Sequence, residues 1–201
     1  MYRKKTKILF LIAVALAFSA CTRRGDDLTA DQVIQKAIKT HGGERYDNMV
    51  VEFDFRNRHF KAKIQNGEYV YERSFKSEDG WIKDTYSNRS FKRTLNENRV
   101  ALSQENRKTY QNATNSVVYF ALLPFHLDDS VINRQLMRSV NIKNEPYYKV
   151  EVTFGNGGGE NFESTYVYWV HKEKLKVDYP ASSFNINGGG VRFREASDAK
   201  M

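Results

Sequence analysis

Cysteine and proline are scarce in this chain, and each shortage narrows the range of possible folds. Cys21 is the only cysteine among the 201 residues, so no disulfide can join two parts of the fold. Only three prolines interrupt a sequence that contains 13 phenylalanines and 12 tyrosines. Aromatic residues are enriched in strands. Together with a mean hydropathy of -0.66, this composition predicts a β-rich protein with a polar surface.

Long apolar runs are also missing beyond the first 20 residues. A transmembrane helix needs about 20 consecutive apolar residues, and no segment after Cys21 approaches that length. The rest of the chain is therefore not expected to span a membrane by a helix.

The usual catalytic and metal-binding motifs are absent as well. The sequence has no G-x-S-x-G elbow and no S-x-x-K pair. The glycine-rich segments 155–159 and 188–190 lack the Lys-Ser/Thr and the following helix of a phosphate loop, which favours hairpin turns. Four histidines lie far apart without the closely spaced partners of a zinc site; they are His41, His59, His126 and His171. We expect no enzyme activity, no catalytic residue, no metal and no cofactor, with an enzyme of unrecognised residues as an alternative.

The first 21 residues have the pattern of a bacterial lipoprotein signal. Four basic residues precede an apolar run from Ile8 to Phe18, which is too short to remain in a bilayer as a helix. Small residues then lead to Cys21, whose thiol suits acylation, although Phe18 stands where leucine is commonest. We predict a signal peptide over residues 1–20, whose removal would lower the net charge from +8 to +4. A secreted protein with a free thiol and an uncleaved anchor are the alternatives.

The next segment predicts a membrane-attached protein of one domain. Residues 21–28 are short and polar and contain Gly25, as is typical of a flexible tether, here carrying acyl chains such as palmitate on Cys21. Residues 29–201 have the length of a single β-type domain. We expect a location in the bacterial cell envelope, lipid-anchored in the outer membrane, on its periplasmic face or at the cell surface. Asp26 and Asp27 faintly resemble the acidic signals that direct some lipoproteins to the surface.

A helix is expected at the start of this domain. Thr29 is placed as its N-cap, with Gln32 completing a capping box. The apolar residues then follow helical spacing up to Gly42 and Gly43, which predict the end of the helix.

Strands are expected from Met49 onward, where the period of the apolar residues changes to two. Asn66-Gly67 is a hairpin signal of type I′. Further strands are expected in segments that include 81–86, 90–94, 100–102, 135–142, 147–154, 164–171, 175–179 and 190–194.

The alternation breaks at residues 111–127, where an apolar run ends at Pro124. Because the residue before a proline disfavours the helical region, we expect a short, very apolar helix that stops there. The order of elements predicts an α+β, mainly β fold. It would be a large curved antiparallel sheet of about ten strands, an unclosed half-barrel, with the N-terminal helix and the mid-chain helix on its concave side.

The sequence contains more large apolar side chains than the two expected helices could cover on the concave face of the sheet. A groove on the concave face for a ligand is one interpretation, and a filled core is the other. The candidate residues depend on strand phase, and a slip of one residue would turn each of them outward. They are Val51, Phe53, Phe55, Phe60, Tyr69, Tyr71, Phe120, Leu123 and Trp169. Basic and aromatic residues also alternate around Lys61 and Lys63. An exported lipoprotein meets lipids, glycans and peptidoglycan before it meets nucleic acid, so we interpret these lysines as a solvated strand face, with anionic head groups as the alternative partner.

Three segments resemble a family of Bacteroidota lipoproteins without an assigned activity. They are Gln35-Lys36-Ala37 with His41-Gly42-Gly43, Asn115 to Pro124, and Asp178-Tyr179 with Asn187 to Arg194. The order of a helix followed by a meander also resembles the LolA/LolB-like lipoprotein-carrier fold, an unclosed barrel whose open side is plugged by helices. That resemblance implies a lipid or acyl-chain site, with the segment 117–123 as a plug or lid.

These observations lead to one functional expectation and one alternative. We expect a non-enzymatic envelope lipoprotein that binds an apolar or amphipathic ligand, a lipid or acyl chain, in the half-barrel. The alternative is a structural or interaction lipoprotein with a filled core that binds protein or glycan.

Overall fold

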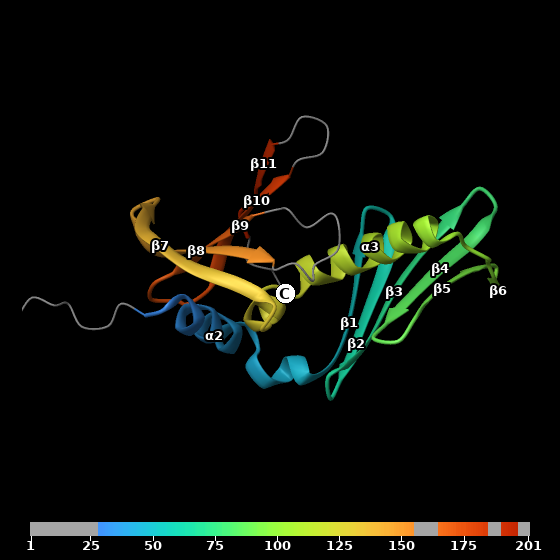
Figure 1. Ribbon diagram of the computed structural model, residues 1–201, viewed down its shortest axis with the longest axis horizontal. Helices are drawn as coiled ribbons and strands as arrows, with labels where there is room; N and C mark the ends of the chain where they lie inside the picture. The colour runs from blue at the N-terminus through green and yellow to red at the C-terminus, as the bar shows by residue number, and fades with distance from the viewer. Residues whose placement is uncertain (1–27, 155–164, 185–189, 197–201) are drawn as a thin grey trace, which may run out of the picture.

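The computed structural model describes residues 28–154, 165–184 and 190–196 (Figure 1). The predicted signal peptide, Cys21, the tether up to residue 27 and the glycine-rich residues 155–159, 188 and 189 lie outside these ranges. In chain order the elements are α2 (Ala30–His41), the 3-10 helix η1 (Gly43–Asp47), β1 (Asn48–Phe55), β2 (Arg58–Gln65), β3 (Glu68–Ser77), β4 (Gly80–Ser87), β5 (Phe91–Leu95), β6 (Asn98–Arg99), α3 (Gln104–Ala121), the 3-10 helix η2 (Phe125–Asp128), β7 (Ile132–Ile142), β8 (Glu145–Phe154), β9 (Tyr166–His171), β10 (Val177–Phe184) and β11 (Gly190–Phe193).

The predicted class is confirmed: the fold is mainly β, antiparallel and unclosed, with two α-helices in the described ranges. The strands are divided between two sheets. Sheet A has the order β1-β2-β3-β4-β5-β6, and sheet B has the order β11-β10-β9-β8-β7. Every pairing in both sheets joins strands that follow one another in the sequence, so each sheet is a meander.

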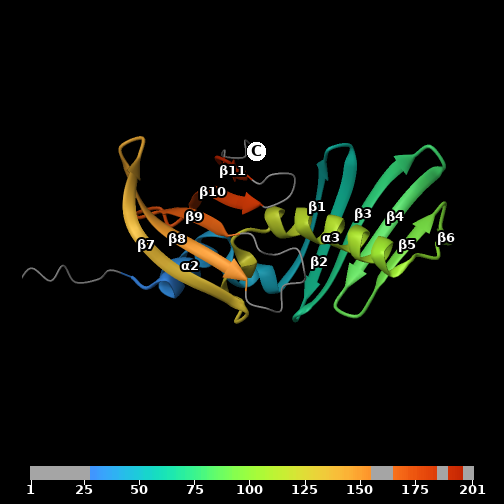
Figure 2. The same ribbon diagram turned by 45° about the horizontal axis from the view of Figure 1, so that its top comes forward.

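Helix α3 explains why the meander is divided. An 18-residue helix is about 27 Å long. It carries the chain from β6 back across sheet A, so that β7 starts at a distance from β6 and builds a second sheet. Figures 1 and 2 show β6 and β7 at opposite ends of the molecule, with α3 running between the two sheets.

Helix α2 begins and ends where the sequence predicts. The Thr29 hydroxyl accepts a hydrogen bond from the Gln32 backbone, and the Gln32 side chain accepts one from the Thr29 backbone, which completes the capping box. The Gly42 N–H donates to the carbonyl of Ile38 and closes the last turn. The apolar stripe of α2 packs against sheet B.

Helix α3 is longer than the predicted apolar helix. It starts at Gln104, where the Ser103 hydroxyl accepts a hydrogen bond from the Asn106 backbone. The residues 100–102, expected as a strand, are not a strand, and the short β6 precedes them. The prediction was wrong here because the first half of α3 is polar and shows no apolar stripe.

A charged ladder on sheet A accounts for that polar half. Asp84 is the direct cross-strand neighbour of Arg73 on β3 and of Arg93 on β5. The fully buried Asp84 carboxylate accepts hydrogen bonds from Nε of Arg73 at 3.0 Å and from Nε of Arg93 at 2.6 Å. The Tyr110 ring of α3 lies 3.3 Å from the Arg93 guanidinium carbon. The polar half of α3 therefore covers the charged part of sheet A.

Two separate apolar cores result. The first joins α2 to sheet B and includes Val33, Ile34, Val150, Tyr168 and Val170. The second joins the apolar half of α3 to sheet A and includes Phe60, Ala62, Ile64, Tyr71, Val118 and Leu122. The two cores meet where α3 ends. Within the described ranges, no helix has the length and apolar character needed to cross a membrane.

Candidate functional site

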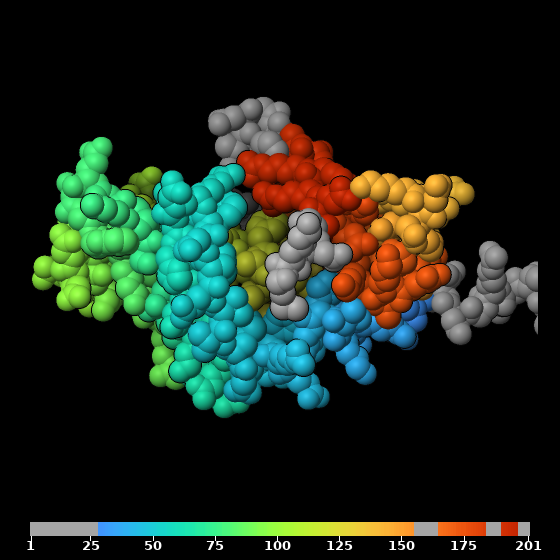
Figure 3. All heavy atoms as spheres, turned by 180° about the vertical axis from the view of Figure 1, so that it is seen from behind, coloured from blue at the N-terminus to red at the C-terminus, as the bar shows by residue number. Residues whose placement is uncertain are grey.

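A hollow lies between the two sheets. Seen from behind, it separates the cyan strands β1 and β2 from the red strands β10 and β11, and α3 lies at its floor (Figure 3). Three apolar side chains of β1, Met49, Val51 and Phe53, pack against the core of sheet A and remain partly exposed. Helix α3 packs mainly on β2, β3 and β4, so this inner face of β1 is left beside the helix rather than beneath it.

Aromatic rings form the opposite side. Phe120 of α3 lies 6.1 Å from Tyr166 of β9, measured between ring centres, and Tyr166 lies 5.5 Å from Phe154 of β8. The guanidinium of Arg194 lies 5.1 Å above the Phe120 ring, in an exposed position after β11. We use the term inter-sheet groove for two groups of partly exposed apolar side chains. Met49, Val51, Phe53 and Val117 pack against the core of sheet A, and Phe120, Tyr166 and Phe154 form a chain of ring contacts.

A polar cluster joins Tyr71 of β3 to His126 and Asp129 at η2. The Tyr71 hydroxyl is 3.2 Å from Nε2 of His126, and Nδ1 of the same ring is 3.7 Å from the Asp129 carboxylate. Burial lowers the pKa of His126, an effect that the nearby Asp129 and Asp128 oppose. Burial raises the pKa of Asp129, and His126 opposes that shift. His126 thus lies between the Tyr71 hydroxyl and the Asp129 carboxylate.

Tyr119 and Tyr168 complete this cluster, and the sequence patterns do not identify either residue. The Tyr119 ring stacks on His126 with 5.6 Å between ring centres and 10° between planes. Among the described residues, the hydroxyls of Tyr119 and Tyr168 are buried without a hydrogen-bond partner. Periodicity shows that such residues are buried, but it gives no information about a hydroxyl that lacks a partner.

The structure brings most of the predicted cavity residues together. Val51, Phe53, Phe60, Tyr69 and Tyr71 all belong to the sheet A core or pack against it. Within this set, Phe60 and Tyr71 are almost fully buried, at 1% and 3% exposure. They support the groove from below, whereas Val51 and Phe53 remain accessible.

The other four predicted residues are not part of the sheet A core. Phe120 reaches the groove from α3, and the neighbouring Leu123 packs against the core of sheet B. Phe55 is 45% exposed at the end of β1. Trp169 lies on the opposite face of sheet B from Tyr168, with its ring 5.6 Å from Phe193. Phe55 and Trp169 are therefore outside the groove.

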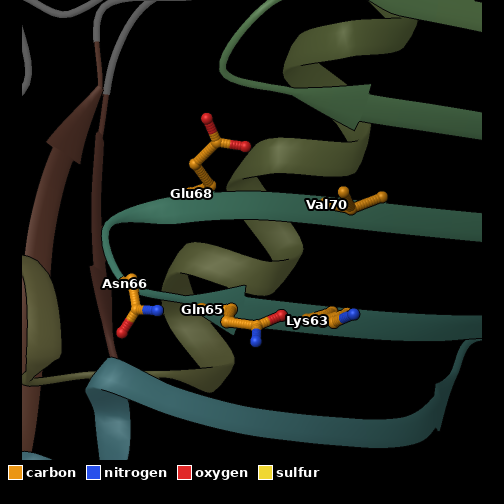
Figure 4. Close-up of a pocket in the computed structure, with 5 residues that line it drawn as sticks. All are labelled: Lys63, Gln65, Asn66, Glu68 and Val70. Carbon is orange, nitrogen blue, oxygen red and sulfur yellow. The ribbon is translucent and has the colours of Figure 1, made fainter.

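A second depression lies on the other face of sheet A. Figure 4 shows Lys63, Gln65 and Asn66 with Glu68 and Val70 around a cavity of about 350 Å³ near the β2–β3 hairpin. Its side chains alternate along the strands with those that face α3, so it is turned to solvent. Its lining is mostly polar and carries one lysine and one glutamate, which gives no defined chemistry for a ligand.

The histidines have structural partners. His171 is fully buried; its Nε2 is 3.0 Å from Glu145, and its Nδ1 accepts the backbone N–H groups of Glu173 and Lys174. His41 bonds the carbonyl of Ala37 at 2.9 Å. Across the described residues, no group of three or more His, Cys, Asp or Glu side chains is placed to hold a metal ion.

Comparisons with known proteins identify a family and two loosely similar structures. A family described as a family of unknown function (DUF6503) matches residues 4–201. The Mycobacterium tuberculosis lipoprotein LppX shares 10% identity, with 83% of this chain and 93% of that chain covered and a TM-score of 0.35. A DUF1329 family protein from Desulfovibrio piger shares 15% identity, with 83% and 86% covered and a TM-score of 0.43. A search of curated proteins finds no match. Similarities this low assign no function to the chain.

Proposed function

Since the chain belongs to this family of unknown function, we propose from its own residues that it is a non-enzymatic envelope lipoprotein that binds a lipid or acyl chain in the inter-sheet groove. The ligand's apolar chain would lie along β1, against Met49, Val51 and Phe53, and extend to Phe120. Binding would be driven by removal of apolar surface from water, at about 0.8 kcal/mol for each buried CH₂ group.

The partial exposure of Met49, Val51 and Phe53 on β1 is the observation that carries this proposal. These three residues lie on the face of β1 that packs against the sheet A core, and they stay partly exposed. The Phe120 ring of α3 contacts Tyr166 of β9. A partly exposed apolar surface in a molecule that also holds a polar cluster at His126 would suit an amphipathic ligand better than a wholly polar one.

Membrane attachment forms the second part of the proposal. Cys21 would carry the acyl anchor, and the following residues would tether the domain at the outer membrane. Expression of the full chain with an alkyne analogue of palmitate tests this part. We expect label on the wild type and none on Cys21→Ser; equal labelling of both would place the acyl group elsewhere or exclude it.

Ligand binding is tested by native mass spectrometry of the chain from Thr22 onward, exported with a cleavable leader and purified without detergent. We expect a copurified lipid. Val51→Asn should reduce its occupancy by about tenfold, because a buried amide without a partner costs about 1–3 kcal/mol.

Val50→Asn is the matched control, since Val50 is the adjacent residue of the same strand, is 56% exposed and faces away from α3. It should retain the lipid. A folded protein that never carries lipid would contradict the proposal and favour the interaction lipoprotein with a filled core. Equal loss in both variants would place the ligand outside the groove.

A further inference from the structure

The segment 190–196 forms one edge of sheet B, and all of its residues are exposed. Strand β11 is the last strand of this sheet among the described residues, and Figure 2 shows it beyond β10. Two of its exposed side chains are large and apolar: Val191 is 74% exposed and Phe193 is 55% exposed. The Phe193 ring adjoins Trp169, with 5.6 Å between ring centres. Apolar side chains grouped at a surface in this way mark a contact with another molecule.

The backbone of β11 has hydrogen-bonding groups that are turned away from sheet B. The N–H of Arg194 donates to the carbonyl of Pro180 on β10. In an antiparallel pair, the backbone groups of successive residues point alternately toward the neighbouring strand and away from it. The N–H and C=O groups of Val191 and Phe193 therefore face outward. Another extended chain can pair with these groups and add a strand to the sheet.

The two faces of this edge differ in chemistry. Val191 and Phe193 lie on the face turned away from α2, where Phe193 packs beside aromatic rings of β9 and β10. Arg192 and Arg194 alternate with them on the other face, and the Arg194 guanidinium lies 5.1 Å from the centre of the Phe120 ring. A strand added to this edge would place its side chains alternately beside the apolar pair and beside the arginine pair.

The arginines disfavour a second copy of this chain as the added strand. Consider two copies of β11 paired antiparallel through their outward backbone groups. The register that sets Val191 opposite Phe193 also sets Arg192 opposite Arg192, and the register that sets Phe193 opposite Phe193 sets Arg192 opposite Arg194. Like charges directly opposite one another destabilise a pair of strands, whereas opposite charges stabilise it. Acidic side chains at these positions therefore suit the edge best.

We propose that the outer edge of β11 binds an extended segment of another protein in which acidic and apolar residues alternate. The acidic side chains lie beside Arg192 and Arg194, and the apolar ones cover Val191 and Phe193. This inference does not rest on lipid binding, because no contact used here requires a ligand in the inter-sheet groove.

The test measures the binding of two fluorescent peptides to the full protein in nanodiscs of zwitterionic lipid. Glutamate alternates with valine in one peptide, and lysine alternates with valine in the other. We expect the glutamate peptide to bind about tenfold more tightly, because the lysines would face Arg192 and Arg194. Arg194→Glu replaces one of these two positive charges by a negative one and should abolish the preference.

Hydrogen exchange at single backbone amides shows where the peptide pairs. In the free protein, the Arg194 amide should exchange slowly because it bonds to Pro180, and the outward Phe193 amide should exchange fast. Addition of the glutamate peptide should slow exchange at Phe193 about tenfold and change little at Arg194.

Val191→Pro and Val191→Thr form a matched pair of variants. Proline at this position removes an outward N–H and leaves the bonds to β10 in place, so it should weaken binding of the glutamate peptide about tenfold. Threonine keeps the N–H and should bind like the wild type. Slow exchange at Arg194 in the proline variant verifies that β11 is still paired with β10.

Every other outcome contradicts the proposal. Binding of neither peptide would overturn it, and equal binding of both would remove the preference for an acidic partner. A peptide that binds without slowing exchange at Phe193, or that binds Val191→Pro like the wild type, would lie elsewhere on the surface. Slow exchange at Phe193 that needs no peptide and increases with protein concentration would assign this edge to a second copy of the chain.

Discussion

At the scale of single residues, Asp84 has the largest predicted effect on stability. Its carboxylate is fully buried between the guanidiniums of Arg73 and Arg93. Asp84→Asn would leave two cations buried with no opposite charge, at a cost of about 3–5 kcal/mol. Urea unfolding followed by circular dichroism measures this loss.

The comparison variant is Glu72→Gln on the outer face of sheet A, where Glu72 pairs with Lys83 in a half-exposed salt bridge. Such surface pairs contribute at most about 1 kcal/mol. Equal destabilisation by the two substitutions would show that the ladder is not an electrostatic unit of the core.

The lowered pKa of His126 leads to a prediction of how the free energy of unfolding depends on pH. Burial lowers its pKa in the fold below the ordinary value of 6.5, so the unfolded chain takes up a proton before the folded one does. Acidification below that ordinary value therefore favours unfolding. Between about pH 7.5 and about pH 5.5 the wild type should lose stability, and His126→Gln should lose less. The midpoints of urea unfolding of both proteins, measured across this pH range, test the prediction. If the midpoints of the wild type and His126→Gln fall in parallel, the predicted role of His126 is contradicted.

The sequence predicts which apolar residues share a face of the sheet only where polar and apolar residues alternate. Val51, Phe53 and Phe60 lie in such strands, so their common face follows from the period. In β9 aromatic and branched residues follow one another from Tyr166 to Val170. Both faces then read as apolar, and the period does not decide between Tyr168 and Trp169. The hydroxyls of Tyr119 and Tyr168 depend on packing between α3 and β9, which no local pattern contains.

At the scale of elements, one hairpin turn contains a residue whose substitution should raise the stability of the protein. Asn66 and Gly67 have φ angles of 51° and 79°, as the sequence predicts for a turn of type I′. The turn between β5 and β6 has the same left-handed backbone at Asn96 and Glu97, with φ of 46° and 68°. A left-handed glutamate is strained, so Glu97→Gly should stabilise the protein by about 0.5–1 kcal/mol.

Thermal or urea unfolding of Glu97→Gly checks this value. Lys92→Gly, on the exposed side of the same hairpin but inside β5, should instead destabilise by about 0.5–1 kcal/mol, because glycine weakens a strand interior. A loss of stability in both variants would show that the strain at Glu97 is already relieved by other contacts.

The two helices show why one element is predictable and the other is not. The local sequence of α2 predicts its start, its apolar stripe and its end. The local sequence of α3 predicts only the apolar half as a helix, because the polar half packs on the charged residues of sheet A. The Ser103 cap marks the start of α3 in the local sequence, and the contact of Tyr110 with Arg93 packs the polar half against sheet A.

At the scale of the whole molecule, the same helix turns one predicted sheet into two. The sequence predicts the class, the antiparallel order and nearly all strands, since each strand and turn is a local pattern. Division into sheets A and B depends on the length and direction of α3, which are fixed by packing. The division also creates the hollow between β1 and the strands of sheet B. The candidate site therefore depends on how the two sheets are arranged, which the local sequence patterns do not predict.

A ligand in that hollow would touch both halves of the molecule, and this gives the last prediction. Each half has its own core, and the two cores meet mainly where α3 ends. A bound lipid adds a common surface between them, so the lipid-bound protein should unfold at a higher temperature than the delipidated protein. A ligand at a hundredfold excess over its Kd contributes about 2.7 kcal/mol, which corresponds to an increase in Tm of about 5–10 °C for a domain of this size. Calorimetry before and after delipidation measures the shift, and rebinding of lipid should restore it. Identical transitions in the two samples, with lipid removal verified by mass spectrometry, would favour a filled core and a surface that binds other partners.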